Sequence, residues 1–467
     1  MNTKYIYNQK EKCVQIERTY QLNLNITKDR KTIIIQKERL TSSQESESHF
    51  THDTHFKLTG ADVDKQLSNV KHKGFEVTDG CNLACTYCAY GKYYNDYDIR
   101  RNEKIDFKKA TLFLDFLLDK LHSPSNENKV NEIYISFYGG EPLLNFEFIE
   151  KMVLYTQHQQ TSSLVFHYMM TTNAILLKKH ISFLVAHDFR LTISLDGSSI
   201  NEGYRKFSNG KPSFDLVFNN VKYAQKAYPD YFTKRVNFNS VMHNLNSVQD
   251  VFSFIYEEFG KIPNFSNLNP TGIKPSYQQE FDEMSKTNWL DIDPKVEKSI
   301  REVLGLEYGE YKRLQKFILN YCGNLYDNYN YLLVRDTCAE KLPTGTCFPF
   351  SRRIFMTVNN KIFPCERIGH QYFLGLVTNE GVQIDCEYIA HKYNTYYNKL
   401  NNQCSRCYFR QHCSQCMFSI EDLDTNPVCN QIADQQKFER YMQANMSLLR
   451  EQPFLYNRMM KEIIIEK

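Results

Sequence analysis

The feature that most constrains this chain is an alternation of short apolar segments and longer amphipathic segments, which begins near residue 73. The short segments suit β-strands, and the longer ones repeat with helical periodicity. Strands that alternate with helices indicate an α/β fold with a parallel sheet and right-handed crossovers, either open or closed into a barrel. Active sites in such folds lie at the carboxyl ends of the strands. We expect strands at 74–78, 133–139, 164–170, 191–195, 235–241 and 264–270, and helices at 106–121, 175–187, 214–227 and 248–260.

Segments of different character flank the α/β region. Short β-like runs occupy residues 1–40, and a polar stretch follows them over 41–55. A hairpin is expected over 352–365, where the pair Asn359-Asn360 suits a tight turn. The expected parts are a β-rich segment with its linker over 1–55, the α/β region over 56–293, a helical bridge over 294–335, a cysteine-rich module over 336–430 and a C-terminal helix over 431–467.

Composition argues against several classes of protein. With 42% hydrophobic and 24% charged residues, the 467-residue chain has the balance of an ordinary soluble protein. Its formal charge of +3 offers no basic excess, so we expect no nucleic-acid partner. No apolar run reaches the length of a membrane span, and the first residues lack the apolar core of a signal peptide. We therefore expect a cytoplasmic protein with no membrane partner.

Cysteines are numerous and unevenly placed. Of the fourteen in the chain, three lie at 81–88 and nine lie between 338 and 429. Thiols stay reduced in the cytoplasm, so such clusters point to metal or redox chemistry and not to disulfides. Plain buried thiols would be scattered along the chain.

The first cysteine cluster directly follows the first expected strand of the α/β region. Cys81, Cys85 and Cys88 have the spacing C-x3-C-x2-C, which brings three thiolates onto one short loop. A four-iron cubane with three protein thiolates leaves one iron open, and the amino and carboxylate groups of an amino acid suit that iron. Structural zinc sites close with four ligands, and ferredoxin-type runs are spaced differently. The loop therefore predicts an iron–sulfur cluster with one open iron.

These three cysteines, with Tyr87 before the third, resemble the CxxxCx(aromatic)C signature of the radical S-adenosylmethionine superfamily. The resemblance implies a partial (βα)6 TIM-like barrel, S-adenosylmethionine as cofactor and a 4Fe–4S cluster on Cys81, Cys85 and Cys88. In this family the reduced cluster cleaves the cofactor to methionine and a 5′-deoxyadenosyl radical. A reducing partner such as flavodoxin or ferredoxin is implied as well.

Later strand ends carry further positions of the same resemblance. The segment FYGGEPLL (137–144) is similar to the family's GGEP motif, and MMTTNA has Ala174 where a glycine is usual. An ordinary strand-end turn or a surface salt bridge is the alternative at each position. Cofactor contacts are implied for Tyr87, Gly139, Gly140, Glu141, Pro142, Thr172, Asn173, Ser194, Asp196 and Arg205.

The C-terminal cysteines resemble the SPASM extension of radical enzymes that modify peptides and proteins. Asn360 stands where glycine is usual, and Cys416 follows Cys413 after two residues instead of three. The resemblance implies two auxiliary 4Fe–4S clusters, and a zinc ribbon over 404–416 is the alternative. The first cluster is implied for Cys347, Cys365 and Cys416 with Cys338 as candidate fourth ligand, and the second for Cys404, Cys407, Cys413 and Cys429; Cys13, Cys322 and Cys386 remain as small apolar residues.

The resemblance covers roughly residues 73–430 and is closest to enzymes that mature peptides. It implies that a ribosomally made precursor peptide is the partner and receives a thioether or another side-chain cross-link. The rival is an anaerobic sulfatase-maturing enzyme, which makes formylglycine and in which the position of Glu366 holds a catalytic base. A non-catalytic iron–sulfur protein for peptide binding or electron transfer is the alternative of another class. The segment 1–55 either recognises a leader peptide by strand pairing or caps the barrel.

Overall fold

The computed structural model describes residues 57–128, 131–201, 203–286, 344–410 and 413–452, the helical residues 314 and 316–318, and the backbone of four strands near the N-terminus. These four strands form one antiparallel sheet in chain order. The predicted helical bridge over 294–335 lies almost entirely outside the described residues, as do Cys322 and Cys338. The four strands are β1 (Tyr5–Asn8), β2 (Cys13–Ile16), β3 (Tyr20–Ile26) and β4 (Ile33–Arg39).

A ten-stranded sheet forms the body of the molecule, in the order β10-β9-β8-β7-β6-β5-β11-β12-β13-β14. Its first six strands are parallel and follow one another in the chain, which confirms the predicted partial (βα)6 barrel. They are β5 (His72–Thr78), β6 (Asn131–Gly139), β7 (Leu164–Thr172), β8 (Arg190–Ser194), β9 (Val236–Met242) and β10 (Asn264–Asn267).

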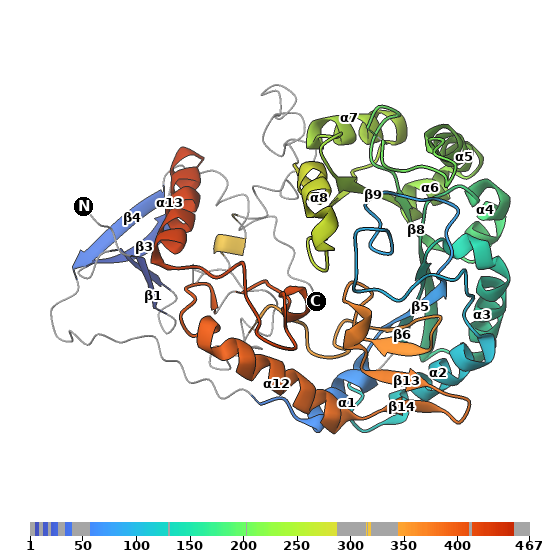
Figure 1. Cartoon of the computed structure of the whole chain (residues 1–467), viewed down its shortest axis with the longest axis horizontal. Coiled ribbons are helices and arrows are strands. Elements are labelled where there is room, and N and C mark those ends of the chain that lie inside the picture. The colour runs from blue at the N-terminus through green and yellow to red at the C-terminus, as the bar shows by residue number, and fades with distance from the viewer. Residues whose placement is uncertain are drawn as a thin grey trace.

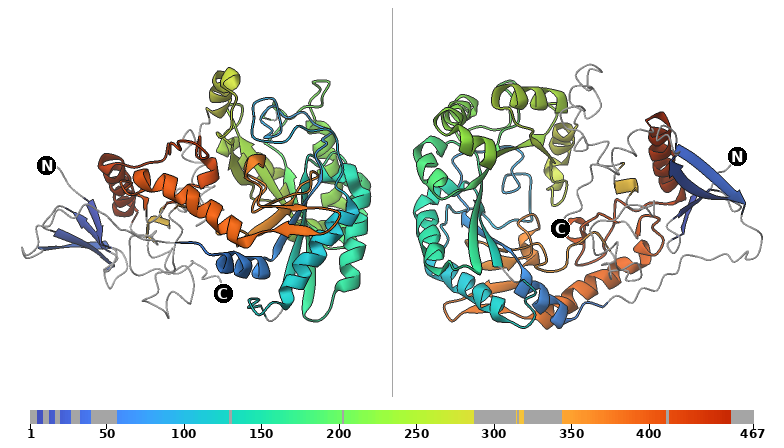
Figure 2. Two further views of the ribbon diagram at one scale, coloured as in Figure 1. Left: turned by 60° about the horizontal axis from the view of Figure 1, so that its bottom comes forward. Right: turned by 180° about the vertical axis from the view of Figure 1, so that it is seen from behind.

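Helices cover the outer face of this curved sheet, and the loops that follow the strands reach its centre (Figure 1). The predicted helix over 214–227 forms with those bounds. Figure 2 shows α12 leading away from α1 toward α13. The helices are α1 (Gly60–Asn69), α2 (Phe107–Asp119), α3 (Phe146–Gln159), α4 (Leu177–Ala186), α5 (Phe214–Ala227), α6 (Pro229–Arg235), α7 (Val248–Phe259), α8 (Gln278–Ser285), α12 (Cys386–Cys404) and α13 (Gln435–Glu451).

Alternating side chains on β6 explain the two faces of the barrel. Ile133, Ile135 and Phe137 are buried, and the Phe137 ring packs against Phe148 of α3, so this face meets the helices. Because successive side chains of a strand point to opposite faces, Tyr138 lies on the other face, toward the lumen. The strand thus separates an apolar core from a lumen that can hold polar groups.

The cysteine-rich segment continues the same sheet. β11 (Arg353–Met356) pairs in parallel with β5, and β12 (Lys361–Phe363), β13 (Gly375–Val377) and β14 (Val382–Ile384) follow in antiparallel order. The predicted hairpin is confirmed, and Asn360 in its turn has a left-handed φ of 61°. Asparagine tolerates that conformation, which accounts for its place in this turn.

Within the described ranges, no helix combines the length and the apolar character that crossing a bilayer requires.

Lys73 predicts an unusual dependence of stability on pH. This β5 side chain is fully buried, its Nζ donates to the carbonyl of Val70 (2.7 Å), and burial lowers its pKa from 10.5 to about 7. Between those two values the unfolded chain binds more protons than the folded one, so stability rises with pH. We expect the free energy of unfolding to rise by about 2 kcal/mol from pH 7 to pH 9 through this group alone. Lys73→Met should remove that rise, as measured by anaerobic urea unfolding at both pH values. The prediction is contradicted if the free energy of unfolding rises equally from pH 7 to pH 9 in the variant and in the natural chain.

Candidate active site

The three-cysteine loop leaves the end of β5 and enters the centre of the barrel (Figure 1). Cys81, Cys85 and Cys88 are partly buried free thiols on this loop. The loop is tied to the segment after β8, because the amide of Ala84 donates to the carbonyl of Lys206 (2.7 Å). Two turns of the chain, from different strand ends, therefore hold the cysteines in place.

The surroundings of the three thiols fit an iron–sulfur cluster. Burial raises the pKa of Cys85 to about 12, so its thiolate needs a bound cation such as iron to be stable at neutral pH. N–H groups already point at the sulfurs: Arg100 Nη2 lies 3.6 Å from Cys88 Sγ, and Asn173 Nδ2 lies 3.8 Å from Cys81 Sγ. Such donors are typical of thiolates that ligate iron.

Two glycines bring the end of β6 against the start of the cysteine loop. A Cβ on Gly139 would lie 2.2 Å from the carbonyl oxygen of Thr78, and one on Gly140 would lie 2.0 Å from that of Gly80. Gly139 also has a φ of +125°, which side-chain-bearing residues rarely adopt. The Gly-Gly pair is thus required for the packing of two strand ends.

Glu141 joins the ends of two strands beside the cysteines. Its carboxylate is buried and accepts hydrogen bonds from Thr172 Oγ1 (2.7 Å) and from the amides of Asn173 (2.7 Å) and Leu143 (3.2 Å). A carboxylate offers about four acceptor positions, so one remains for the ammonium group of a cofactor. Pro142 begins the short 3-10 helix η2 (Pro142–Asn145) that follows.

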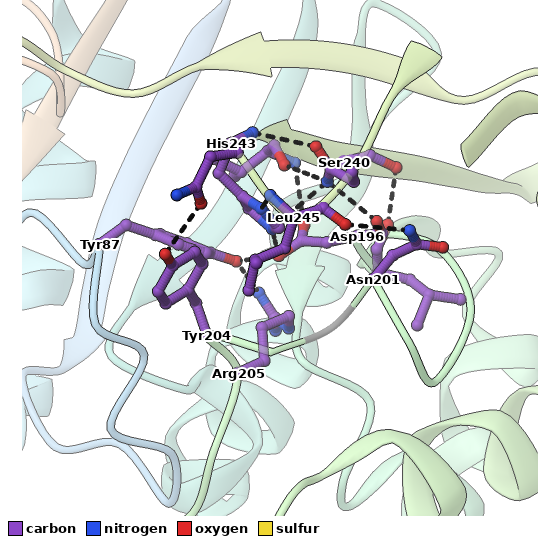
Figure 3. Close-up of polar contacts among 12 residues, drawn as sticks. Tyr87, Asp196, Asn201, Tyr204, Arg205, Ser240, His243 and Leu245 are labelled. Atoms are coloured by element: carbon purple, nitrogen blue, oxygen red, sulfur yellow. Dashed lines mark hydrogen bonds and ion pairs between the residues drawn. The ribbon is translucent and has the colours of Figure 1, made fainter. Parts of the chain in front are cut away.

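A second group of polar side chains, Tyr87, Asp196 and Arg205, joins the cysteine loop to the segment that follows β8 (Figure 3). The hydroxyl of Tyr87 donates to Asp196 Oδ2, and Arg205 Nη1 donates to the Tyr87 oxygen (3.0 Å). All three residues are buried, and burial raises the pKa of Tyr87 well above its usual value, so its hydroxyl remains a donor. Asp196 Oδ1 accepts from the amide of Val241 (2.9 Å). Ser194 ends β8 nearby and is half-buried.

Sequence reasoning missed His243, which follows the end of β9 and is fully buried in this group (Figure 3). Its ring is stacked on Tyr87, with the centroids 6.0 Å apart, and meets the ring of Tyr204 edge-on at 4.9 Å. Nδ1 accepts from the amide of Leu245 (3.2 Å), so in the neutral ring Nε2 carries the proton, 3.9 Å from Asp196 Oδ2. The sequence did offer a signal for His243, because this histidine closely follows a predicted barrel strand, where active-site residues are expected.

The C-terminal cysteines fall into two groups. Burial and then the thiols of Cys413, Cys407 and Cys429 raise the pKa of Cys404 to about 12, so these four lie together. In the second group, burial and Cys347 raise the pKa of Cys416, and burial with both thiols raises the pKa values of Tyr393 and Tyr397 on α12. Cys365 raises the pKa of Tyr393 as well. Cys386 lies apart, at the first position of α12.

Glu366 lies directly after Cys365 and is paired with an arginine. Arg353 Nη1 donates to both carboxylate oxygens, at 2.6 and 2.7 Å. Burial would raise the pKa of Glu366, but Arg353, the backbone amide of Glu366 and Arg367 together outweigh burial, and the pKa lies below its ordinary value. A carboxylate held in this way is a weak base, so its predicted role as a catalytic base stays a prediction.

The cysteine loop and the C-terminal hairpin are joined by one aspartate. Asp98 accepts from Lys361 Nζ (2.8 Å) and Asn359 Nδ2 (2.9 Å) of the hairpin. Its own amide donates to His370 Nδ1 (3.1 Å). On the lumen side, burial, Glu366 and Cys88 raise the pKa of Tyr138, which places this phenol between the two cysteine-bearing parts.

A partial parallel barrel with three thiols on the loop after its first strand is an arrangement suited to iron–sulfur chemistry. The family model described as the radical SAM superfamily matches residues 75–255. Residues 75–255 therefore carry a radical SAM domain, and S-adenosylmethionine and a 4Fe–4S cluster are the cofactors of that family.

Several curated proteins are similar in sequence. The uncharacterized protein MJ0907 of Methanocaldococcus jannaschii is 39% identical over 148 residues, which are 32% of this chain and 46% of that protein. The radical SAM cyclopropyl synthase TigE of Paramaledivibacter caminithermalis is 24% identical over 74% of this chain and 67% of its own length. A cysteine-type anaerobic sulfatase-maturating enzyme of Clostridium perfringens is 21% identical over 74% of this chain and 89% of its own. The chain thus spans less than half of the first of these relatives.

Solved structures share the fold. The structure of native anSMEcpe with bound AdoMet has a TM-score of 0.54 at 18% identity and covers 84% of this chain and 100% of its own. The same protein with bound AdoMet and a peptide named Kp18Cys has a TM-score of 0.52, at 18% identity over 84% of this chain and 99% of its own. At these identities the likeness is one of fold.

Proposed function

We propose that this chain is a radical SAM enzyme that modifies a ribosomally made peptide by forming a thioether or another side-chain cross-link. The observation that carries the proposal is the continuous sheet from β5, which leads to the cysteine loop, to β11 and β12, which lead to Cys365. Two cysteine-bearing parts therefore face one lumen. An enzyme that only cleaved its cofactor would need only the first of them.

The residues of the first part bind and orient the cofactors. Cys81, Cys85 and Cys88 would ligate the cluster, and Glu141 would accept from the ammonium group of S-adenosylmethionine through its free acceptor position. When bound and reduced, the cluster supplies the electron that cleaves the sulfonium bond. A small electron-transfer protein such as flavodoxin or ferredoxin would deliver that electron.

The residues of the second part favour a peptide as substrate. Tyr138, Glu366 and Arg353 give the lumen a phenol and an ion pair, which can bind the polar backbone of an extended peptide. The names of the relatives, a cyclopropyl synthase and sulfatase-maturating enzymes, support this choice. So does the peptide Kp18Cys bound in a structure that shares the fold.

Formylglycine formation is the second candidate, because an acidic residue, Glu366, directly follows Cys365. The ion pair with Arg353 argues against it, since a carboxylate with a lowered pKa takes up a proton poorly. Cross-linking through other residues does not depend on that carboxylate as a base, and we therefore prefer it.

One experiment separates the candidates. Reduced, anaerobically reconstituted enzyme and S-adenosylmethionine are incubated either with the peptide encoded beside its gene or with a sulfatase-derived peptide containing cysteine or serine. We expect the first peptide to lose two hydrogens and to gain a cross-link in tandem mass spectra. An aldehyde in the second peptide, trapped by a hydrazide, would instead establish formylglycine formation. No 5′-deoxyadenosine with either peptide would indicate a non-catalytic protein.

A further inference from the structure

Two tyrosines of α12 carry hydroxyl groups that are buried without a partner. Tyr393 is fully buried, Tyr397 is 4% exposed, and among the described residues neither hydroxyl has a hydrogen-bond partner. A buried donor left unpaired costs about 1–3 kcal/mol, so two of them one helical turn apart call for a physical explanation. Tyr396, on the same helix, donates to Asp424 Oδ1 (2.7 Å) in the ordinary way.

Both unpaired hydroxyls lie beside the same cysteines. After burial and Tyr397, the thiols of Cys416, Cys347 and Cys365 raise the pKa of Tyr393, so the ring of Tyr393, which packs on Phe418, lies within electrostatic reach of all three. The hydroxyl of Tyr397 has Cys416 and Cys347 as its acidic neighbours. These three thiols are the set that the C-terminal sequence pattern assigns to the first auxiliary cluster.

The chain holds two of these thiols together from both sides. The amide of Met417 donates to Thr346 Oγ1 (2.8 Å), which joins the residues next to Cys416 and Cys347. A Cβ on Gly345 would lie 2.3 Å from the backbone of Ser414, so the two segments are in close backbone contact. The Tyr393 ring packs against Phe418, two residues beyond Cys416.

We propose that Tyr393 and Tyr397 donate their hydroxyl hydrogens to the sulfur atoms of an auxiliary iron–sulfur cluster held by Cys347, Cys365 and Cys416. Hydrogen bonds to cluster sulfurs stabilise the more negative, reduced cluster and so raise its reduction potential. The two tyrosines are positioning and tuning residues, since they act through the cluster. The inference shares one requirement with the proposed function, namely that an iron–sulfur cluster binds to Cys347, Cys365 and Cys416. It does not depend on which reaction the enzyme performs.

The test measures the reduction potential of that cluster. In a chain with Cys81, Cys85 and Cys88 replaced by alanine, the electron paramagnetic resonance signals of the reduced protein come from the auxiliary clusters. We expect Tyr393→Phe and Tyr397→Phe each to lower the potential of one of these signals, while the iron content stays unchanged. Tyr396→Phe, the matched control on the same helix, should leave both potentials unchanged. If the triple variant fails to fold, the reduction potentials are measured in the same way in the protein with all cysteines intact.

Unchanged potentials in both variants, with full iron content, would show that the hydroxyls do not bond to the cluster. Iron content that accounts for no cluster on Cys347, Cys365 and Cys416 would overturn the inference as well. A shifted potential in an enzyme that modifies no peptide would leave the inference standing and would refute the proposed function.

Discussion

Replacing Cys85 by alanine is expected to reduce the cleavage of S-adenosylmethionine to background. Only two thiolates would then remain on the loop, and two cannot hold a four-iron cluster that keeps one iron open for the cofactor. The measurement is 5′-deoxyadenosine formed under reducing conditions by anaerobically reconstituted protein, together with the iron content, which should fall by about one 4Fe–4S cluster.

Cys386→Ala is the matched control for this variant. Cys386 is a partly buried free thiol at the first position of α12, away from both C-terminal groups. We expect the control to retain its iron and its cofactor cleavage. Undiminished cleavage by Cys85→Ala would show that the three-cysteine loop does not hold the cluster that cleaves the cofactor.

Glu141→Gln is expected to weaken the binding of S-adenosylmethionine about ten- to a hundredfold. The variant keeps the shape of the side chain, but only one of its two terminal atoms can accept hydrogen bonds. Thr172 and the amide of Asn173 now bond to different oxygens of Glu141, so one buried donor loses its partner. The charge that faces the cofactor's ammonium group is lost too, and a hydrogen bond to a charged group is worth about 1.5–3 kcal/mol.

Equilibrium dialysis with labelled cofactor measures this change without requiring turnover. Glu147→Gln serves as control, because Glu147 is an exposed residue of α3 that pairs with Lys151 at the surface. We expect it to bind the cofactor like the natural chain. Equal affinities for the two variants would show that Glu141 joins the strand ends without contacting the cofactor.

The pattern of the sequence determined the barrel and the loop that bears the first cysteines. Alternation of strand and helix is a local signal, and the helix expected at 214–227 forms with those bounds. The spacing of Cys81, Cys85 and Cys88 is local as well, so the chemistry of that loop could be read before any contact was known. The turn at Asn360 was predicted for the same reason, since an asparagine pair favours a left-handed residue.

Contacts between distant segments could not be read in this way. The pairing of β11 with β5 joins residues that are more than 280 positions apart, and no periodicity announces it. The ion pair of Arg353 with Glu366 depends on how the hairpin closes, and the stacking of His243 on Tyr87 depends on two strand ends that meet in the barrel.

The sequence alone thus determined which chemical groups the protein carries and on which local elements they stand. The tertiary structure decided which of these groups meet. It also placed near Cys347 and Cys416 two tyrosine hydroxyls that find no hydrogen-bond partner in the part of the chain that the structure describes. The reason is physical: spacing along a strand, helix or loop is set by backbone geometry, whereas the partners of a buried polar group are set by packing across the whole fold.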